Sequence, residues 1–205
     1  MERSGVSELQ YIAAVENVPS ILRRGILSHD TACDLPHLSL ADEGVQSLRS
    51  SKQVPGGERL HRYANLYFNA RNPMLYRLVR TRPPQSLVVL RIDAAVLDTA
   101  GAVITDYNAA KSYAGFWPSP AGLAKVNVLL TYAHFWTHPD PAIEDRNAAA
   151  TQAELLIPNR VPPAMIQGFY VANSKGQAAV ESVQSSLAPR VDATLFFEDR
   201  RRDSG

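Results

Sequence analysis

The chain has 205 residues, of which 45% are hydrophobic and 20% charged, with 21 lysines and arginines against 20 aspartates and glutamates. This length and composition predict one compact domain over residues 1–205 and exclude bulk disorder, and the net charge of +1 excludes a polycation that binds any acidic polymer. No apolar run approaches the ~20 residues of a membrane helix and MERSGVSELQ has no apolar signal core, so we expect no membrane contact and a cytoplasmic location.

The first predicted element is a short helix in AAVENVPSILRRGILS, which Asn17 can cap and Gly25 ends. Residues 29–57 are mostly polar, and we expect a long functional loop there with a helical turn or more around residues 41–50. Beyond it, NLYFNA and SLVVLRID have the β-branched and aromatic content typical of strands, and LYRLVR between them predicts a helix.

The second half of the chain continues this mixture. GAVITDYNAA predicts a strand that runs into a turn, residues 121–136 predict a helix, and THPDPAIEDRNAAAT is a loop or helix entry before TQAELLIP, a short buried strand. IQGFYVAN then predicts a strand, GQAAVESVQSSLAP a helix, DATLFFED a strand, and residues 200–205 a frayed tail. Because strands and helices mix without regular βαβ alternation, the predicted class is α+β with a mostly antiparallel or mixed sheet.

A basic segment runs from Arg59 to Arg91. It contains seven arginines and no acidic residue, with Tyr63, Tyr67, Phe68 and Tyr76 interleaved. Arginines bind phosphates and aromatic rings stack on bases, so the segment is one candidate for a nucleic-acid contact. A solvated helix face with core aromatics explains the same composition, and the residues leave both interpretations open.

Glu154 is the residue that most needs an explanation. The sequence has no P-loop, no dinucleotide-binding glycine pattern and no G-x-S-x-G elbow, and His61, His134 and His138 are spaced singly, so no metal site is expected. Glu154 precedes Leu155, Leu156 and Ile157, where a carboxylate resists burial unless it is paired, hydrogen-bonded or used. Taken alone, it is best read as the start of the outward face of a strand.

The segments ENVPSILRRGIL, VPGG, YFNARNPMLY, ITDYNAA and TQAELLI occur in the order and approximate spacing of the DarT family of DNA ADP-ribosyltransferase toxins. The chain resembles that family from about Gln10 to Phe197, most specifically in YFNARNPMLY. The resemblance implies a single domain with an ADP-ribosyltransferase-like split mixed sheet flanked by helices. It also implies that NAD is a substrate whose ribose is attacked by a nucleobase as nicotinamide leaves.

The resemblance implies two catalytic residues. Glu154 matches the catalytic glutamate, whose carboxylate would stabilise the positive charge that builds on the ribose. Arg49 matches the family's essential arginine, which contacts the phosphates of NAD, and its high pKa restricts it to charge stabilisation and positioning. Gln152, two residues before Glu154 and expected on the same strand face, would contact the acceptor base.

The resemblance also places NAD-binding residues early in the chain. Tyr11, Ile12 and Ala13 would cradle the nicotinamide and its ribose, and Ser20 and Leu27 would lie near the NAD molecule. Tyr67 and Phe68 either stack on nicotinamide or belong to the core. Many relatives carry a histidine at position 11 and a threonine at position 13, so NAD orientation here would rest on backbone groups, or the protein would be weak, specialised or divergent in target.

Residues 107–153 correspond to the loop that chooses the acceptor in the superfamily. Asn108, Lys111 and Tyr113 are its candidates for phosphate or base contacts, and we assign Arg71 to the same role. A base under attack has to leave the duplex or start single-stranded, so single-stranded DNA is the expected partner. Modification of RNA or protein, or a non-catalytic nucleic-acid-binding module, are the alternatives. The family is typically paired with a macrodomain antitoxin, which the resemblance alone implies here.

Overall fold

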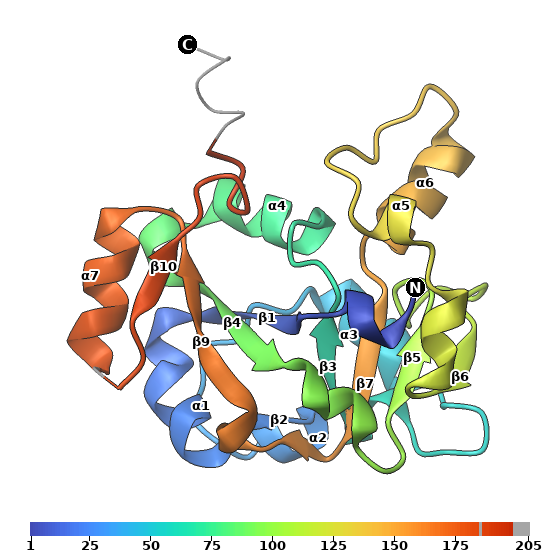
Figure 1. Cartoon of the computed structure of the whole chain (residues 1–205), viewed down its shortest axis with the longest axis horizontal. Coiled ribbons are helices and arrows are strands. Elements are labelled where there is room, and N and C mark those ends of the chain that lie inside the picture. The colour runs from blue at the N-terminus through green and yellow to red at the C-terminus, as the bar shows by residue number, and fades with distance from the viewer. Residues whose placement is uncertain (185, 199–205) are drawn as a thin grey trace.

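The computed structural model (Figure 1) describes residues 1–184 and 186–198, and the predicted frayed tail at 200–205 lies outside them. Its centre is an eight-stranded sheet in the order β10-β9-β4-β1-β3-β7-β5-β6. β10 and β9 are parallel and the other neighbours are antiparallel, so the predicted α+β class with a mixed sheet is confirmed. The strands are β1 Glu8–Ala14, β3 Tyr63–Tyr67, β4 Leu87–Asp93, β5 Val103–Thr105, β6 Phe116–Pro118, β7 Glu154–Pro158, β9 Ile166–Val171 and β10 Pro189–Val191.

The sheet is split between β1 and β3. β1 pairs with β4 along all of its seven residues, and β3 pairs with β7 along all of its five. Within the described residues, β1 and β3 are paired at Gln10 and Tyr67 alone. The two halves of the sheet therefore diverge along the rest of β1, where Tyr11, Ile12 and Ala13 lie.

Helices cover both faces of the sheet. β4 is buried on both sides, so its alternate residues enter two cores. Val88 and Leu90 pack with α1 (Val18–Arg24) and α7 (Ser174–Val183), whereas Val89 packs with α4 (Pro73–Thr81). α1 and α7 are in contact and lie together at the left of Figure 1, with α4 above the sheet.

The first helix ends where the sequence predicts. Gly25 follows α1 with φ of 87°, and a side chain there would collide with the carbonyl oxygen of Val161. Asn17 stands at the start of α1 but makes no capping bond, so that part of the prediction is wrong. Its amide instead donates to the Leu38 carbonyl at 2.9 Å and accepts from the Leu38 N–H at 3.0 Å, which fastens the following loop.

The loop at residues 29–57 contains two helices, α2 (His29–Ala32) and α3 (Glu43–Ser50). α3 confirms the helical turn expected around residues 41–50, whereas the sequence did not predict α2. Asp42 caps α3 by accepting from the Val45 N–H at 3.2 Å. Just before the loop, β2 (Ile26–Leu27) pairs with β8 (Arg160–Val161). Short 3₁₀ turns link the other elements at Arg3–Gly5, Val15–Asn17, Leu60–Arg62 (η3), Pro84–Ser86, Ala94–Asp98 and Pro163–Met165.

Two predicted elements are wrong. Residues 121–136 do not form one helix but a 3₁₀ turn (Ala121–Lys125) and the short α5 (Val128–Thr131), because Asn127 caps a new start by accepting from the Leu130 N–H. The described part of DATLFFED, residues 192–198, is not a strand, because Asp192 accepts from the Leu195 N–H at 2.8 Å and fixes a turn. The entry predicted before β7 is α6 (Pro141–Ala150). No helix within residues 1–184 and 186–198 is long and apolar enough to cross a membrane.

Candidate active site

Glu154 is the first residue of β7, and its side chain is completely buried. The interpretation as an outward-facing residue is therefore wrong. β7 lies between β3 and β5, and Glu154 stands directly opposite Tyr67 on one strand and Thr105 on the other. Directly opposed residues share a face of the sheet, and the Glu154 N–H donates to Thr105 Oγ1 at 3.2 Å. The carboxylate is thus fixed by a central strand.

Arg49 pairs with this carboxylate. Its Nη1 lies 3.0 Å from Glu154 Oε1 and 3.1 Å from Oε2, and the Ala109 N–H donates to Oε1 at 3.1 Å. Arg49 is 6% exposed, so both charges are out of water. Burial acts to lower the pKa of Arg49, but the charge and hydrogen bonds of Glu154 act against it and raise that pKa overall. The guanidinium therefore stays charged and is not a proton acceptor.

A cavity of about 530 Å³ lies against this pair. Volumes of 300–1,000 Å³ are typical of small-molecule sites. Arg49 forms part of the wall, and Glu154 lies directly behind its guanidinium. Eight more residues that the sequence or the resemblance assigned to the site line the same cavity: Tyr11, Ile12, Ala13, Leu27, Tyr67, Asn108, Lys111 and Gln152. The split of the sheet thus brings β1, the polar loop and the segment before β7 to one place.

Gln152 reaches the cavity from a different position than expected. It lies in the turn between α6 and β7, so it is not on the strand. Its N–H donates to the Ala149 carbonyl at 3.1 Å. The predicted strand register for Gln152 is wrong because β7 begins only at Glu154.

Two residues assigned to NAD by resemblance are absent from the cavity wall. Phe68 is 2% exposed and packs in the core with Leu66 and Leu155, so the core alternative holds and it has no face for nicotinamide. Ser20 is half-buried on α1, outside the wall. Tyr67, by contrast, is both buried and part of the wall.

Arg71 is 5% exposed and is committed to internal contacts. It donates to the Thr194 carbonyl, and its guanidinium lies 4.2 Å from the centre of the Phe197 ring. Its guanidinium thus contacts the last described segment of the chain, and its assignment to acceptor DNA stays a prediction.

The basic segment from Arg59 to Arg91 does not form one phosphate track. Arg91 pairs with Glu8 at 2.7 Å, and Arg77 donates to the Leu40 carbonyl at 3.2 Å from the cavity wall. Arg59 is exposed. Arg62, Arg77 and Arg80 are exposed as well. The segment thus combines structural arginines with exposed ones, and its contact with nucleic acid stays a prediction.

Arg77 and Asn17 are site residues that the sequence analysis missed. Both line the cavity, and they fasten the polar loop at Leu40 and Leu38 respectively. The sequence showed Arg77 only as one of seven arginines and Asn17 only as a helix cap. Neither pattern indicates that Arg77 contacts a residue 37 positions away or that Asn17 contacts one 21 positions away. Together they fix the loop that carries α3 and Arg49.

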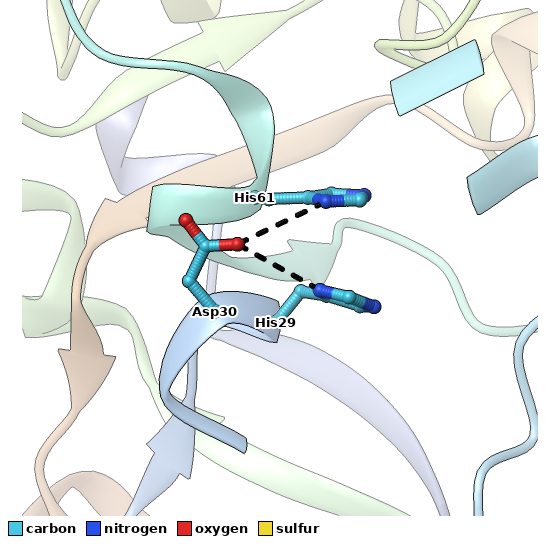
Figure 2. A group of neighbouring side chains, drawn as sticks. All are labelled: His29, Asp30 and His61. Atoms are coloured by element: carbon cyan, nitrogen blue, oxygen red, sulfur yellow. Dashed lines mark ion pairs between the residues drawn. The ribbon is translucent and has the colours of Figure 1, made fainter. Parts of the chain in front are cut away.

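The spacing of the histidines in the sequence suggested that each is isolated, but His61 has a neighbouring histidine in the structure. Figure 2 shows His29, Asp30 and His61 together, with possible ligand atoms within 4.8 Å of one another. The two rings stack with centroids 4.0 Å apart and planes 21° apart, and each Nδ1 lies 3.9 Å from Asp30 Oδ1. Both Nδ1–Oδ1 distances are longer than a hydrogen bond, so we interpret this cluster as an electrostatic and stacking contact between α2 and η3 and assign no metal to it.

The acceptor-loop candidates are tied to α6. Lys111 pairs with Asp145, and the Tyr113 hydroxyl donates to the same carboxylate at 2.8 Å. The hydrogen bond from Lys111, followed by that from Tyr113, lowers the pKa of Asp145. Tyr113 is exposed outside the cavity wall, so its predicted DNA contact stays a prediction.

Comparison with known proteins agrees with this geometry. A family model described as "ssDNA thymidine ADP-ribosyltransferase, DarT" matches residues 10–195. A DNA ADP-ribosyl transferase–DNA ADP-ribosyl glycohydrolase fusion protein of Thermosipho africanus is 32% identical over 205 residues, which cover 95% of this chain and 50% of the fusion protein. The chain thus spans about half the length of that relative. A DNA ADP-ribosyl transferase of a Thermus species is 27% identical over 176 residues, 82% of each protein.

Solved structures of DarT proteins also match this chain. Thermosipho africanus DarTG in complex with ADP-ribose superposes with a TM-score of 0.79 at 29% identity, covering 93% of this chain and 51% of that one. Thermus sp. 2.9 DarT in complex with ADP-ribosylated ssDNA superposes with a TM-score of 0.80 at 24% identity, covering 93% and 96%. The expected ADP-ribosyltransferase-like fold is confirmed. With its model matched from residue 10 to residue 195, the chain belongs to the DarT family of single-stranded-DNA thymidine ADP-ribosyltransferases.

Proposed function

We propose that this chain transfers ADP-ribose from NAD to a base of single-stranded DNA, with thymidine, the base named for the family, as the target. The observation that carries the proposal is the completely buried strand carboxylate of Glu154, paired with Arg49 in the wall of a cavity of about 530 Å³. The structures of Thermus sp. 2.9 DarT with NAD+ and with ADP-ribosylated ssDNA support the same pair of substrates.

The reaction exchanges one bond at the ribose for another. The bond between the nicotinamide nitrogen and ribose C1′ breaks, and nicotinamide leaves with the bonding electrons. A ring nitrogen of the base forms a new bond to C1′ and releases its proton to solvent. Positive charge builds on the ribose between these events, as it does in glycoside hydrolysis, and the protein's task is to stabilise that charge.

Glu154 is placed to stabilise it. A carboxylate offers about four lone-pair positions, and the contacts from Arg49 and Ala109 use three of them. The remaining position can accept a hydrogen bond from the ribose 2′-hydroxyl once the Arg49 side chain moves away from the carboxylate. A negative charge fixed on a strand and shielded from water acts more strongly there than it would in solution.

Arg49 serves the same step from the other side. Its guanidinium stays charged, so it can hold Glu154 in its rotamer before NAD binds and then move to the phosphates of NAD. α3 carries it, and Asp42, Asn17 and Arg77 fix the loop on which α3 sits.

Tyr11 and Tyr67 complete the nicotinamide end of the proposed site. Burial raises the pKa of both phenols, and the Glu154 charge raises that of Tyr67 further. Both remain neutral at physiological pH. The Tyr11 hydroxyl can donate a hydrogen bond to NAD, whereas the Tyr67 hydroxyl donates to Met74 Sδ at 3.4 Å. Tyr11 therefore offers a donor where many relatives carry histidine, and the backbone of Ala13 replaces the threonine hydroxyl.

The remaining predictions concern partners. Asn108, Lys111 and Gln152 line the cavity and would contact the acceptor base or its phosphate. The Thermosipho africanus relative joins a transferase to a DNA ADP-ribosyl glycohydrolase. This supports a partner of the macrodomain type that removes the mark, as a toxin that modifies cytoplasmic DNA would require.

The test is incubation of the purified chain with NAD and synthetic oligonucleotides, analysed by mass. We expect one added ADP-ribose on single strands that contain thymidine and none on the duplex or on homopolymers of the other bases. Modification of RNA or of the protein itself with no DNA product would assign a different acceptor. Retention of unmodified DNA and NAD would indicate a non-catalytic binding module.

A further inference from the structure

Two residues of the cavity wall each have one buried side-chain atom with no hydrogen-bond partner among the described residues. The atoms are Oε1 of Gln46 and Nε2 of His61, and both residues line the cavity that Arg49 borders. A buried polar atom without a partner carries the full cost of its lost hydration. Each such atom therefore needs an explanation, and a ligand of the cavity can supply the missing bond.

The two residues belong to neighbouring elements. Gln46 lies three residues before Arg49 on α3, so the two side chains share one face of the helix. His61 lies on η3, and α3 contacts η3. The two residues therefore lie in the part of the wall that adjoins the Arg49–Glu154 pair.

The surroundings of His61 make its Nε2 an acceptor. Figure 2 shows its Nδ1 directed at Asp30 and its ring stacked on His29. The Asp30 carboxylate favours the proton on Nδ1, which leaves the lone pair on Nε2. Burial first, and then the charges of His29, Arg49 and Arg59, lower the pKa of His61 against the opposing effect of Asp30. The ring is therefore neutral at neutral pH.

From these observations we infer that Gln46 and His61 form a subsite for the neutral hydrogen-bond donors of NAD, namely its ribose hydroxyls or the N–H groups of its carboxamide and adenine. Two acceptors repel a phosphate, so this subsite binds a sugar or a ring and leaves the pyrophosphate to Arg49 and Arg77, which also line the cavity. The inference rests on the proposed function, because it takes NAD as the ligand of this cavity.

The test is NAD affinity, measured by calorimetry on the whole chain without DNA. His61→Phe keeps a flat ring that can stack on His29 and removes the acceptor, and Gln46→Met keeps the length and removes the amide. We expect each to weaken NAD binding about tenfold, as the loss of one buried hydrogen bond does. Thr131→Val is the matched control, because Thr131 Oγ1 is also buried with no partner among the described residues but lies outside the wall. It should bind NAD as the wild type does.

NAD analogues identify the donor. An acetylpyridine analogue lacks the carboxamide N–H, a hypoxanthine analogue lacks the adenine amine, and deoxyribose analogues lack single hydroxyls. One analogue should bind the wild type more weakly than NAD does, whereas His61→Phe should bind that analogue and NAD equally. This analogue lacks the group that His61 binds. A merely structural role of His61 predicts no such selective effect.

The outcomes separate the two proposals. Wild-type affinity for NAD in both His61→Phe and Gln46→Met would overturn the subsite. If the wild type binds NAD but modifies no DNA, and each variant binds NAD tenfold more weakly, the subsite stands and the transfer is refuted. A wild-type chain that binds no NAD would refute both.

Discussion

The buried pair of Arg49 and Glu154 gives the most demanding test of the structure. Arg49→Met leaves the carboxylate, which is completely buried, with only the Ala109 N–H and no opposite charge. Removing one partner of a buried ion pair typically costs about 3–5 kcal/mol. For a chain of this length that corresponds to a fall in Tm of about 6–20 °C.

Glu154→Gln should cost less, about 3 kcal/mol, because an amide oxygen still accepts from Arg49 and from the Ala109 N–H. The double variant leaves no unpaired charge, so its loss of stability should fall short of the sum by about 2–3 kcal/mol. Urea unfolding of the four proteins measures this coupling. Strict additivity would refute the buried pair, since residues that do not interact show no such shortfall.

Three further predictions concern the loop, the acceptor segment and pH. Asp42→Ala removes the cap of α3 and should lower the free energy of unfolding by about 1 kcal/mol, measured by urea unfolding. Asp145→Asn removes the charge that holds Lys111 and Tyr113, so KM for the oligonucleotide should rise while NAD affinity, measured by calorimetry, stays constant. Acidification below about pH 6.5, the ordinary pKa of histidine, should weaken NAD binding, because the pKa of His61 is lowered and its protonation removes the acceptor; stronger binding would instead indicate a phosphate-binding role.

Local patterns in the sequence predict the elements that local physics decides. β4 and β9 are found from β-branched and aromatic runs, and Gly25 ends α1 because its backbone conformation excludes other residues. The strand predicted for DATLFFED is wrong although its residue types fit a strand. Phe196 and Phe197 are as buried as strand residues, but Asp192 accepts a hydrogen bond from the Leu195 N–H and turns the chain. Residue type alone does not separate these cases.

The site depends on contacts that no local pattern contains. Glu154 and Arg49 are 105 residues apart, and the sequence related them only through the family resemblance. The two orphaned acceptors are invisible for the same reason, since an unsatisfied atom is a property of packing. Phe68 shows the converse error, because an aromatic next to a site residue is indistinguishable in sequence from one that faces the core.

The most direct test of the central claim is single-turnover transfer by Glu154→Gln at saturating NAD. The account predicts that this variant binds NAD within about tenfold of wild type, because the carboxylate acts mainly in the transition state. Transfer to a thymidine-containing single strand should fall by at least about 10²–10³-fold, the usual loss when one preorganised charge-stabilising group is removed. Transfer at a rate close to wild type, from a folded variant with bound NAD, would show that the buried carboxylate takes no part in the reaction.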